Sequence, residues 1–357
     1  METLSITDLK ARSIAEPGEY AVHSQIAGCQ AKETRTGKPY YEVELADGGG
    51  SIKLKAWQDS PAFPQAEVLR GDEWVCATGH WSSGEYGIDA RDWSMRPLKD
   101  EEIAEVLAGS GPIREKQAAD YAYIESTCAS LTDPRFKALC THFLSQLGER
   151  FRRTAGARNV HHARRGGLVE HVAQMMRCAD AICSVYPQLN RDLLLTGVLF
   201  HDCGKLWENC YPKSGFNMPN DFRAELMGHI SIGADIVNGL WKQIEAESGA
   251  LWSTLEPSTD RTRLHLLHLI LSHHGTLEWG SPVLPKTPEA LALHHVDNID
   301  AKLEIIKDGY HDKEQLSDEV FSKVWPLGGN IVRPLPSVDE GSYPGAGDPT
   351  AGGSLAD

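Results

Sequence analysis

Seven histidine and aspartate residues follow one another in an ordered pattern along the second half of the chain. In chain order they are His171, the pair His201-Asp202, His229, the pair His273-His274, and Asp297. Imidazole and carboxylate groups are the ligands that suit Mn, Fe, Co, Ni or Zn. Seven such groups exceed what one ion needs, so the pattern indicates two divalent cations that share a bridging carboxylate.

The pair His201-Asp202 has the most informative surroundings. It follows an apolar segment, DLLLTGVLF (192–200), and precedes Cys203-Gly204-Lys205. A charged pair at the end of a buried helix is costly unless it is paired or coordinates a metal. The glycine allows a sharp turn, so Lys205 is predicted to point back at the site as a positive group for phosphate. Asp202 and Lys205 are therefore the candidate catalytic residues.

Long helices must position these residues, and the chain from about 98 to 328 has the required periodicity. Residues 168–182 place their apolar side chains on one helical face, and 192–200 is apolar all round, which predicts a buried helix. Thr287-Pro288 is typical of a helix start. The apolar stripe expected on that last helix consists of Val296, Ile299, Leu303 and Ile306. His265, His268 and His294 are interpreted as ordinary core histidines.

The first part of the chain has a different pattern. Short alternating runs broken by turn signals, as in KPYYEVELADGGGSIKLKAW, predict about five strands between residues 18 and 97. Asp47-Gly48 is a hairpin signal between two of them. This spacing favours a small all-β Greek-key barrel such as an OB-fold. We therefore expect a multidomain chain: a barrel over 1–97, an all-α helical bundle over 98–328, and a disordered acidic tail over 329–357.

Composition limits the function classes. The 357 residues carry a formal net charge of −15, which argues against a general nucleic-acid coat protein. The N-terminus lacks the features of a signal peptide, and no apolar stretch is long enough to span a membrane. The eight scattered cysteines are then interpreted as reduced thiols in a cytoplasmic protein.

The segments around these ligands resemble a known family. The order H…HD…H…HH…D is that of the two-metal members of the HD superfamily, although the GYP segment of the HD-GYP phosphodiesterases is absent. HHARRGGLVEH, LLLTGVLFHDCGK, GHISIG, LSHHGTLEWGSP and VDNIDAKL, together with the barrel segment, resemble the YhaM-like 3′→5′ exoribonucleases over roughly residues 15–325. That family joins an N-terminal OB-fold to an HD domain.

The resemblance implies a role for each ligand. His171, His201, Asp202 and Asp297 would hold one ion, and Asp202 would bridge to a second ion held by His229, His273 and His274. Manganese is the favoured metal, and Fe, Co, Ni or Zn is compatible with the same ligands. Asp300, one turn after Asp297, is expected to orient a ligand or water or, equally, to be a packing carboxylate.

Two regions are candidates for substrate binding. Residues 150–165 hold six arginines and no acid, and from them His161, His162, Arg164 and Arg165 are expected to grip phosphates, unless this is a solvated basic turn. On the barrel, one outward face carries Tyr40, Lys53, Lys55 and Trp57, which suits base stacking or interdomain packing. The barrel has more acidic than basic residues, which weakens the case for tight RNA binding.

Three functions fit these observations. The first is a 3′→5′ exonuclease on single-stranded RNA or also DNA, which releases nucleoside monophosphates by two-metal hydrolysis. The second is a phosphohydrolase of small nucleotides or cyclic dinucleotides. The third is a non-catalytic adaptor built on an inactive domain. The sequence is compatible with a homo-oligomer and leaves the metal, the substrate and the role of the tail open.

Overall fold

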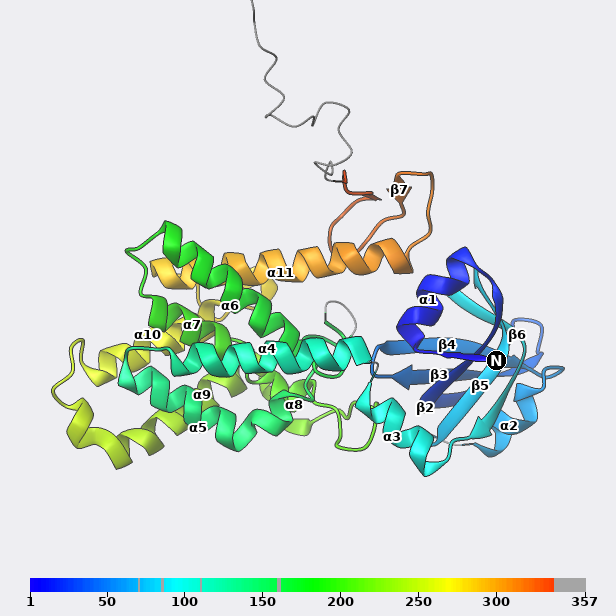
Figure 1. Ribbon diagram of the computed structural model, residues 1–357, viewed down its shortest axis with the longest axis horizontal. Coiled ribbons are helices and arrows are strands. Elements are labelled where there is room, and N and C mark those ends of the chain that lie inside the picture. Colours follow the sequence, from blue (N-terminus) through cyan, green and yellow to red (C-terminus); the bar gives the residue numbers. More distant parts are fainter. Residues whose placement is uncertain (70, 85–86, 110, 159–161, 337–357) are drawn as a thin grey trace, which may run out of the picture. The chain divides into compact units, whose positions relative to one another are not determined.

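An antiparallel β-barrel forms the N-terminal part of the protein. The computed structural model describes residues 1–69, 71–84, 87–109, 111–158 and 162–336. The barrel contains β1 (Glu2–Leu4), α1 (Ile6–Ala15), β2 (Gly18–Glu33), β3 (Pro39–Asp47), β4 (Gly50–Trp57), α2 (Ala62–Val68), β5 (Trp74–Gly84) and β6 (Gly87–Pro97). The strands follow the order β4-β3-β2-β5-β6, with β1 parallel to β2 (Figure 1). This all-β region confirms the predicted fold class.

Alternation of side chains sets the register of the barrel. Val43 faces Leu54 and Leu45 faces Ile52 across β3 and β4, and all four are buried. The residues between them in β4 point outward, as the period of two requires. The two edge strands meet through Trp93 of β6, which is buried and donates from Nε1 to the carbonyl oxygen of Lys55 in β4 at 3.2 Å. The barrel therefore has its own apolar core.

Helices make up the rest of the first compact unit, which ends at Asp312. They are α3 (Asp100–Ala108), α4 (Gly111–Ala129), α5 (Pro134–Phe151), α6 (Gly167–Val185), α7 (Arg191–Phe200), α8 (Lys205–Glu208), α9 (Phe222–Trp252), α10 (Thr259–Ser272), the 3-10 turn η1 (Leu277–Trp279) and α11 (Pro288–Asp312). Residues Leu193–Phe200 of α7 are buried, as the apolar sequence predicted. Helix α7 is therefore the centre of the helical core.

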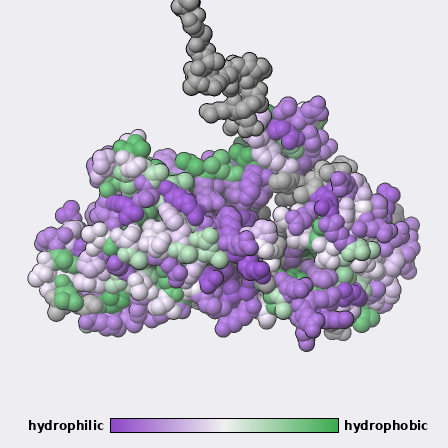
Figure 2. Space-filling view, viewed as in Figure 1, coloured by the Kyte–Doolittle hydropathy of each residue, from purple (hydrophilic) through white to green (hydrophobic). Residues whose placement is uncertain are grey.

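Helix α11 turns a different face inward from the one predicted. Leu293 and Val296 are buried, but Ile299 and Leu303 are 52% and 62% exposed. Figure 2 shows a hydrophobic strip over this helix. The prediction of Ile299 and Leu303 as core residues was wrong, because the buried face also contains the carboxylate of Asp300, whose partners lie inside the helical region.

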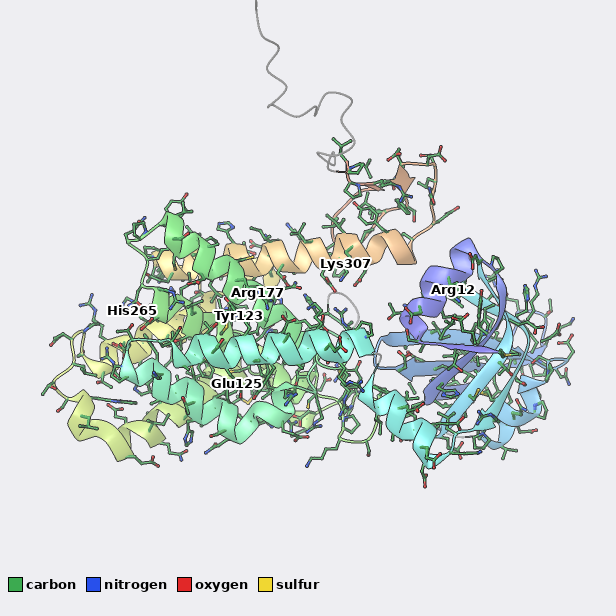
Figure 3. The ribbon with its side chains drawn as sticks, viewed as in Figure 1. Arg12, Tyr123, Glu125, Arg177, His265 and Lys307 are labelled. Carbon is green, nitrogen blue, oxygen red and sulfur yellow. The ribbon has the colours of Figure 1, made fainter. Side chains whose placement is uncertain are left out.

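Charged side chains bind α4 to α6. Arg177 of α6 lies over the ring of Tyr123 in α4, with 4.4 Å between the guanidinium carbon and the ring centroid (Figure 3). Arg177 also donates to Asp120 of α4 at 2.8 Å. These contacts hold the helix that carries His171 against its neighbour.

The barrel and the helices share a small apolar cluster. It consists of Ala46 from β3 together with Ala155, Tyr211 and Phe216 from the helical region. The second compact unit begins at Lys313 and contains a short hairpin, β7 (Val320–Phe321) and β8 (Ile331–Val332). The expected acidic tail falls mainly on residues 337–357, which lie outside the described residues, and the predicted domain limits stay a prediction.

Candidate metal centre

Five helices bring the seven predicted ligand residues together. His171 lies in the second turn of α6, and His201-Asp202 follows α7 directly. His273 and His274 end α10, and Asp297 lies in α11. His229 follows Gly228, whose φ of 67° interrupts α9 and starts a new helical segment. Residues up to 126 positions apart in sequence therefore meet at one place, which we call the seven-residue cluster.

One half of the cluster contains His171, His201, Asp202 and Asp297. His171 Nε2 lies 3.3 Å from His201 Nε2 and 3.4 Å from Asp297 Oδ1, and His201 Nε2 lies 3.2 Å from Asp202 Oδ2. Ligand bonds of about 2.0–2.1 Å at a tetrahedral angle place neighbouring donor atoms about 3.3 Å apart. These spacings suit donor atoms arranged around one cation.

The other half contains His229, His273 and His274, whose ligand atoms lie within 4.8 Å of one another. Asp202 Oδ1 lies 3.5 Å from His229 Nε2 and 3.6 Å from His273 Nε2. One carboxylate therefore faces both halves, with Oδ2 toward the first and Oδ1 toward the second. This is the arrangement that a carboxylate bridging two ions requires.

Orphaned polar atoms provide a test of whether a cation fits. Asp202 Oδ1, His229 Nε2 and His273 Nε2 are buried and have no hydrogen-bond partner among the residues that the structure describes. Burying such atoms without a partner is costly, and native proteins rarely do so. All three atoms point into the same space, so a bound cation would satisfy them together.

The outward nitrogens of the histidine rings are held by fixed acceptors. His201 Nδ1 donates to Val198 O at 2.8 Å, and His273 Nδ1 donates to Ile270 O at 2.7 Å. A ring that donates from Nδ1 keeps the lone pair of Nε2 for a metal. The Nδ1 atoms of the other three histidines in the cluster make similar hydrogen bonds. His171 binds Asp300 at 2.7 Å, His229 binds Glu208 at 2.8 Å and His274 binds Trp279 O at 2.7 Å.

The surrounding charges set the protonation states of the cluster residues. Burial opposes ionisation of Asp202, but the charges of Lys205 and His201 hold its pKa well below the ordinary value. Burial and neighbouring His201 lower the pKa of His273 well below its usual range. Burial also disfavours the charged form of His171, but hydrogen bonds to Asp297 and Asp300 outweigh it and raise the pKa of His171 to about 10. An ionised carboxylate and neutral imidazoles are the forms that bind metals, and binding a metal would displace a proton from His171.

Asp300 is a positioning residue for His171. Its Oδ2 accepts from His171 Nδ1 at 2.7 Å and from His162 Nε2 at 2.9 Å, and its Oδ1 accepts from Gln174 Nε2 at 2.6 Å. His162 was expected to grip a substrate phosphate, but it is fully buried and faces Asp300. The structure therefore places His162 behind the cluster, and the phosphate role predicted for it is not supported.

The predicted phosphate-binding arginines already have partners in the protein. Arg164 forms ion pairs with Glu170 and, at 3.1 Å, with Glu304. Arg165 donates to the carbonyl oxygens of three residues in the 212–215 loop. The carboxylates of Glu170 and Glu304 take up most of the Arg164 donors, so a phosphate role for Arg164 is not supported. The contacts of Arg165 involve only its terminal nitrogens, so its phosphate role stays a prediction. His161, the fourth residue of that set, lies outside the described residues.

Lys205 begins α8 and lies beside Asp202. Its Nζ is 2.7 Å from Asp202 Oδ2 and donates to the carbonyl oxygen of Gly156 at 2.6 Å. The side chain is largely buried. Its ammonium group therefore sits beside the carboxylate that faces both halves of the cluster.

The four barrel residues lie on one outward surface. Tyr40 and Trp57 are directly opposite across β3 and β4, with ring centroids 4.9 Å apart. Lys55 Nζ lies 5.7 Å from the Trp57 ring centroid, and Lys53 Nζ lies 3.6 Å from Glu44. The surface thus contains an aromatic pair with a cation beside it.

Glu208 is a supporting residue that sequence reasoning missed. Its Oε2 accepts from both the ring Nδ1 and, at 3.1 Å, the backbone N–H of His229. Burial opposes ionisation of Glu208, but the hydrogen bond from His229 keeps its pKa below the ordinary value. No periodic or motif signal links residues 21 positions apart, so only folding reveals this contact.

We expect Glu208→Ala to weaken metal binding by about 10- to 100-fold, because the His229 ring loses the acceptor that orients it. Competition titration with a metal-sensitive dye measures the change. Glu208→Gln keeps an acceptor oxygen and is expected to lose less. An alanine variant with wild-type affinity would show that the ring is oriented by its other contacts.

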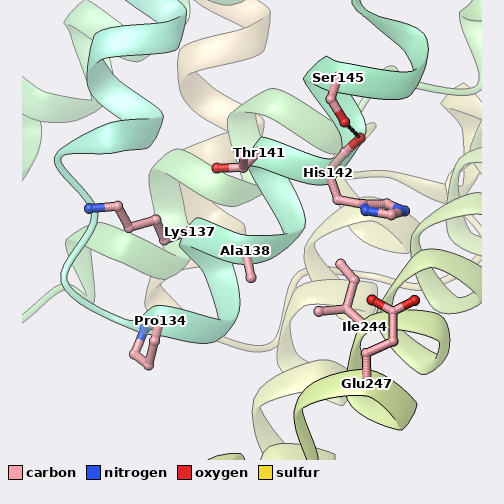
Figure 4. A pocket seen from close by; sticks show the side chains of 8 residues that line it. All are labelled: Pro134, Lys137, Ala138, Thr141, His142, Ser145, Ile244 and Glu247. Carbon is pink, nitrogen blue, oxygen red and sulfur yellow. Dashed lines mark hydrogen bonds between the residues drawn. The ribbon is translucent and has the colours of Figure 1, made fainter.

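A separate cavity of about 470 Å³ is lined by residues of α5 and α9, among them Lys137, His142 and Glu247 (Figure 4). It shares no residue with the seven-residue cluster. Its hydrogen bond from Ser145 to the His142 carbonyl oxygen lies within α5. The cavity therefore adds no group to the candidate metal centre.

Residues 168–302 match the family model of the HD domain. This range includes every residue of the seven-residue cluster, and it indicates a metal-dependent phosphohydrolase. Among the helices that the structure describes, none is both long and apolar enough to cross a bilayer.

Two solved structures match part of the chain. The asparaginyl-tRNA synthetase from Pyrococcus horikoshii is 11% identical over 40% of this chain and 35% of its own, with a TM-score of 0.23. A Leishmania major Friedlin structure, described as an aspartyl-tRNA synthetase, is 8% identical over 42% of this chain and 33% of its own, with a TM-score of 0.21. The chain matches about a third of each synthetase, and these scores are too low to indicate a shared fold.

Proposed function

We propose that this protein is a metal-dependent 3′→5′ exonuclease that acts on single-stranded RNA and releases nucleoside monophosphates. The observation that carries the proposal is the position of Asp202, whose two oxygens face two separate sets of histidine nitrogens. Two cations held in this way would activate water for attack on phosphorus and would offset charge on the attacking and leaving oxygens. The resemblance to the YhaM-like exoribonucleases supports this choice of substrate.

Different residues of the chain would have different roles in this reaction. Asp202 and the Nδ1-anchored histidines would hold the cations, and because their side chains are already fixed, little reorganisation of these residues would be needed. Lys205 supplies a positive charge beside Asp202, which favours negative phosphoryl oxygens. No side chain is required as a nucleophile, because the attacking group comes from water.

The aromatic pair on the barrel supports a single-stranded substrate. Tyr40 and Trp57 offer stacking faces, and Lys55 lies beside them to contact the backbone. Stacking tolerates any base, which suits an enzyme that removes successive nucleotides.

The acidic balance of the barrel favours a second candidate, a phosphohydrolase of small nucleotides or cyclic dinucleotides. Both candidates are tested by incubating the protein and Mn²⁺ with 5′-labelled single-stranded RNA and, separately, with a panel of nucleotides. A ladder of products that shortens from the 3′ end supports the exonuclease. Turnover of small nucleotides without any RNA shortening contradicts it.

Removal of metal is expected to abolish activity and to lower the unfolding temperature. A ligand present at 100 times its Kd stabilises the folded state by about 2.7 kcal/mol. Dialysis against dipicolinate, followed by elemental analysis and a thermal melt, measures both effects. Re-addition of Mn²⁺ should restore activity and stability together, whereas full activity in the metal-free protein would contradict the proposal.

A further inference from the structure

The exposure of its residues shows where the seven-residue cluster opens to solvent. His171, His201 and His273 are completely buried, and Asp202 is nearly so. The side chains of Asp297 and His229 retain 18% and 15% exposure. His274 is also partly exposed. A substrate must therefore approach on the side that His229, His274 and Asp297 share.

The segment after His274 presents a large, exposed aromatic side chain. Trp279, in the η1 turn, is 54% exposed, although tryptophan is usually well buried. Its carbonyl oxygen accepts from His274 Nδ1 at 2.7 Å. The backbone of this turn is thus fixed directly to a residue of the cluster, five positions away.

The ring of Trp279 is also held in place. Its centroid lies 6.1 Å from that of His294, which in turn donates from Nδ1 to His273 O at 2.9 Å. Lys302 Nζ lies 5.9 Å from the centre of the indole. Trp279 is thus an exposed aromatic residue with a cation nearby, its backbone bound to the cluster residue His274 and its ring beside His294. This arrangement suits recognition of a planar ligand next to a phosphate.

We propose that Trp279 is a stacking platform for the nucleobase next to the scissile phosphate, with Lys302 at its edge. This inference rests on the proposed exonuclease function and adds a binding residue to it. The phosphate would lie at the cluster, and the base would turn outward onto the indole. Because every base has a π-face, this platform would bind the 3′ end of RNA without a sequence preference.

The test combines substitutions in the protein with substitutions in the substrate. Trp279→Ala and Trp279→Phe are assayed on a 5′-labelled oligonucleotide and on versions with an abasic residue at the terminal or penultimate 3′ position. Tyr186→Ala is the matched control, since Tyr186 is an aromatic residue with the same 54% exposure. It follows the end of α6, about 22 Å along that helix from His171.

We expect Trp279→Ala to lower kcat/KM on the intact oligonucleotide by about 5- to 150-fold, mostly through KM. Trp279→Phe should retain most of the activity, and Tyr186→Ala all of it. On one of the two abasic substrates, the wild type should lose a similar factor, and Trp279→Ala should lose nothing further. Metal content should stay unchanged in every variant, because the substituted side chains are exposed.

Two results would overturn the inference in different ways. If Trp279→Ala loses the same factor on intact and abasic substrates, the indole does not contact a base, although the exonuclease proposal stands. If the wild type leaves every oligonucleotide intact, the proposed function fails and the stacking role fails with it. A loss of metal in Trp279→Phe as well as in Trp279→Ala would assign the residue to the support of His274 instead.

Discussion

Replacing Asp202 with asparagine is expected to lower kcat on RNA by about 10³-fold or more. Asparagine has one acceptor oxygen and no charge, so one half of the seven-residue cluster must lose its shared ligand. The amide nitrogen would then donate toward a position that a cation occupies. A loss of about 4 kcal/mol in transition-state stabilisation corresponds to that factor. Elemental analysis should show at least one equivalent of metal missing.

The same substitution should destabilise the metal-free protein. Lys205 is largely buried, and Asp202 is its carboxylate partner at 2.7 Å. Removing one partner of a buried ion pair typically costs about 3–5 kcal/mol, because the remaining charge stays desolvated. The free energy of unfolding in urea, measured without metal, reports this effect.

The natural control for Asp202→Asn is the same change at Asp235. Asp235 is exposed and pairs with Arg223 on the surface of α9. Such a pair contributes at most about 1 kcal/mol, so stability, metal content and activity should all stay near wild type. If Asp202→Asn retains two equivalents of metal and wild-type kcat, the carboxylate does not bridge two ions.

Gly204→Ala is expected to have the second largest effect. A methyl group at this position would lie 1.9 Å from the carbonyl oxygen of His229, which is far inside van der Waals contact. Gly204 has an ordinary helical φ of −65°, so the strain arises from this close approach and not from its own conformation. The backbone that carries Asp202 and Lys205 must then separate from the helix that carries His229.

We expect this separation to lower the free energy of unfolding by about 3 kcal/mol. A displacement of about 1 Å in the cluster should also lower kcat/KM by about 100-fold. Gly239→Ala is the control, because it lies in the same α9 and its added methyl group would meet nothing within 4 Å. That substitution should be neutral or stabilising by up to about 1 kcal/mol. Wild-type stability and activity in Gly204→Ala would show that the backbone around Gly204 can move away from the helix that carries His229 with no loss of free energy.

Asp202→Asn and Gly204→Ala disturb the seven-residue cluster in different ways. Both variants should be less stable and less active than the wild type, so metal content is the measurement that separates them. Asp202→Asn removes a charged ligand, so at least one equivalent of metal should be missing. Gly204→Ala keeps all seven ligands and displaces some of them by a methyl group that touches no substrate. Comparison of the two variants therefore distinguishes loss of a ligand from displacement of one.

The amino-acid sequence determined which residue types could bind metal and which helices carry them. The seven residues could be told apart from the other histidines because their order and context resemble those of the two-metal HD proteins. For His201-Asp202 there was also a physical reason, since a charged pair at the end of a buried helix is costly without a partner. The buried character of α7 and the pairing of β3 with β4 were predictable for a similar reason. Local periodicity in both cases specifies which side chains must leave water.

Only the tertiary structure decided what the remaining polar residues do. A basic run at 150–165 suggested phosphate binding, but folding gave Arg164 two carboxylate partners and turned His162 toward Asp300. In α11 likewise, Asp300 is buried with three hydrogen-bond partners, whereas the apolar Ile299 is 52% exposed. Local sequence patterns contain no information about partners 100 or more residues away, and an ionisable side chain takes its role from the charge that folding places beside it.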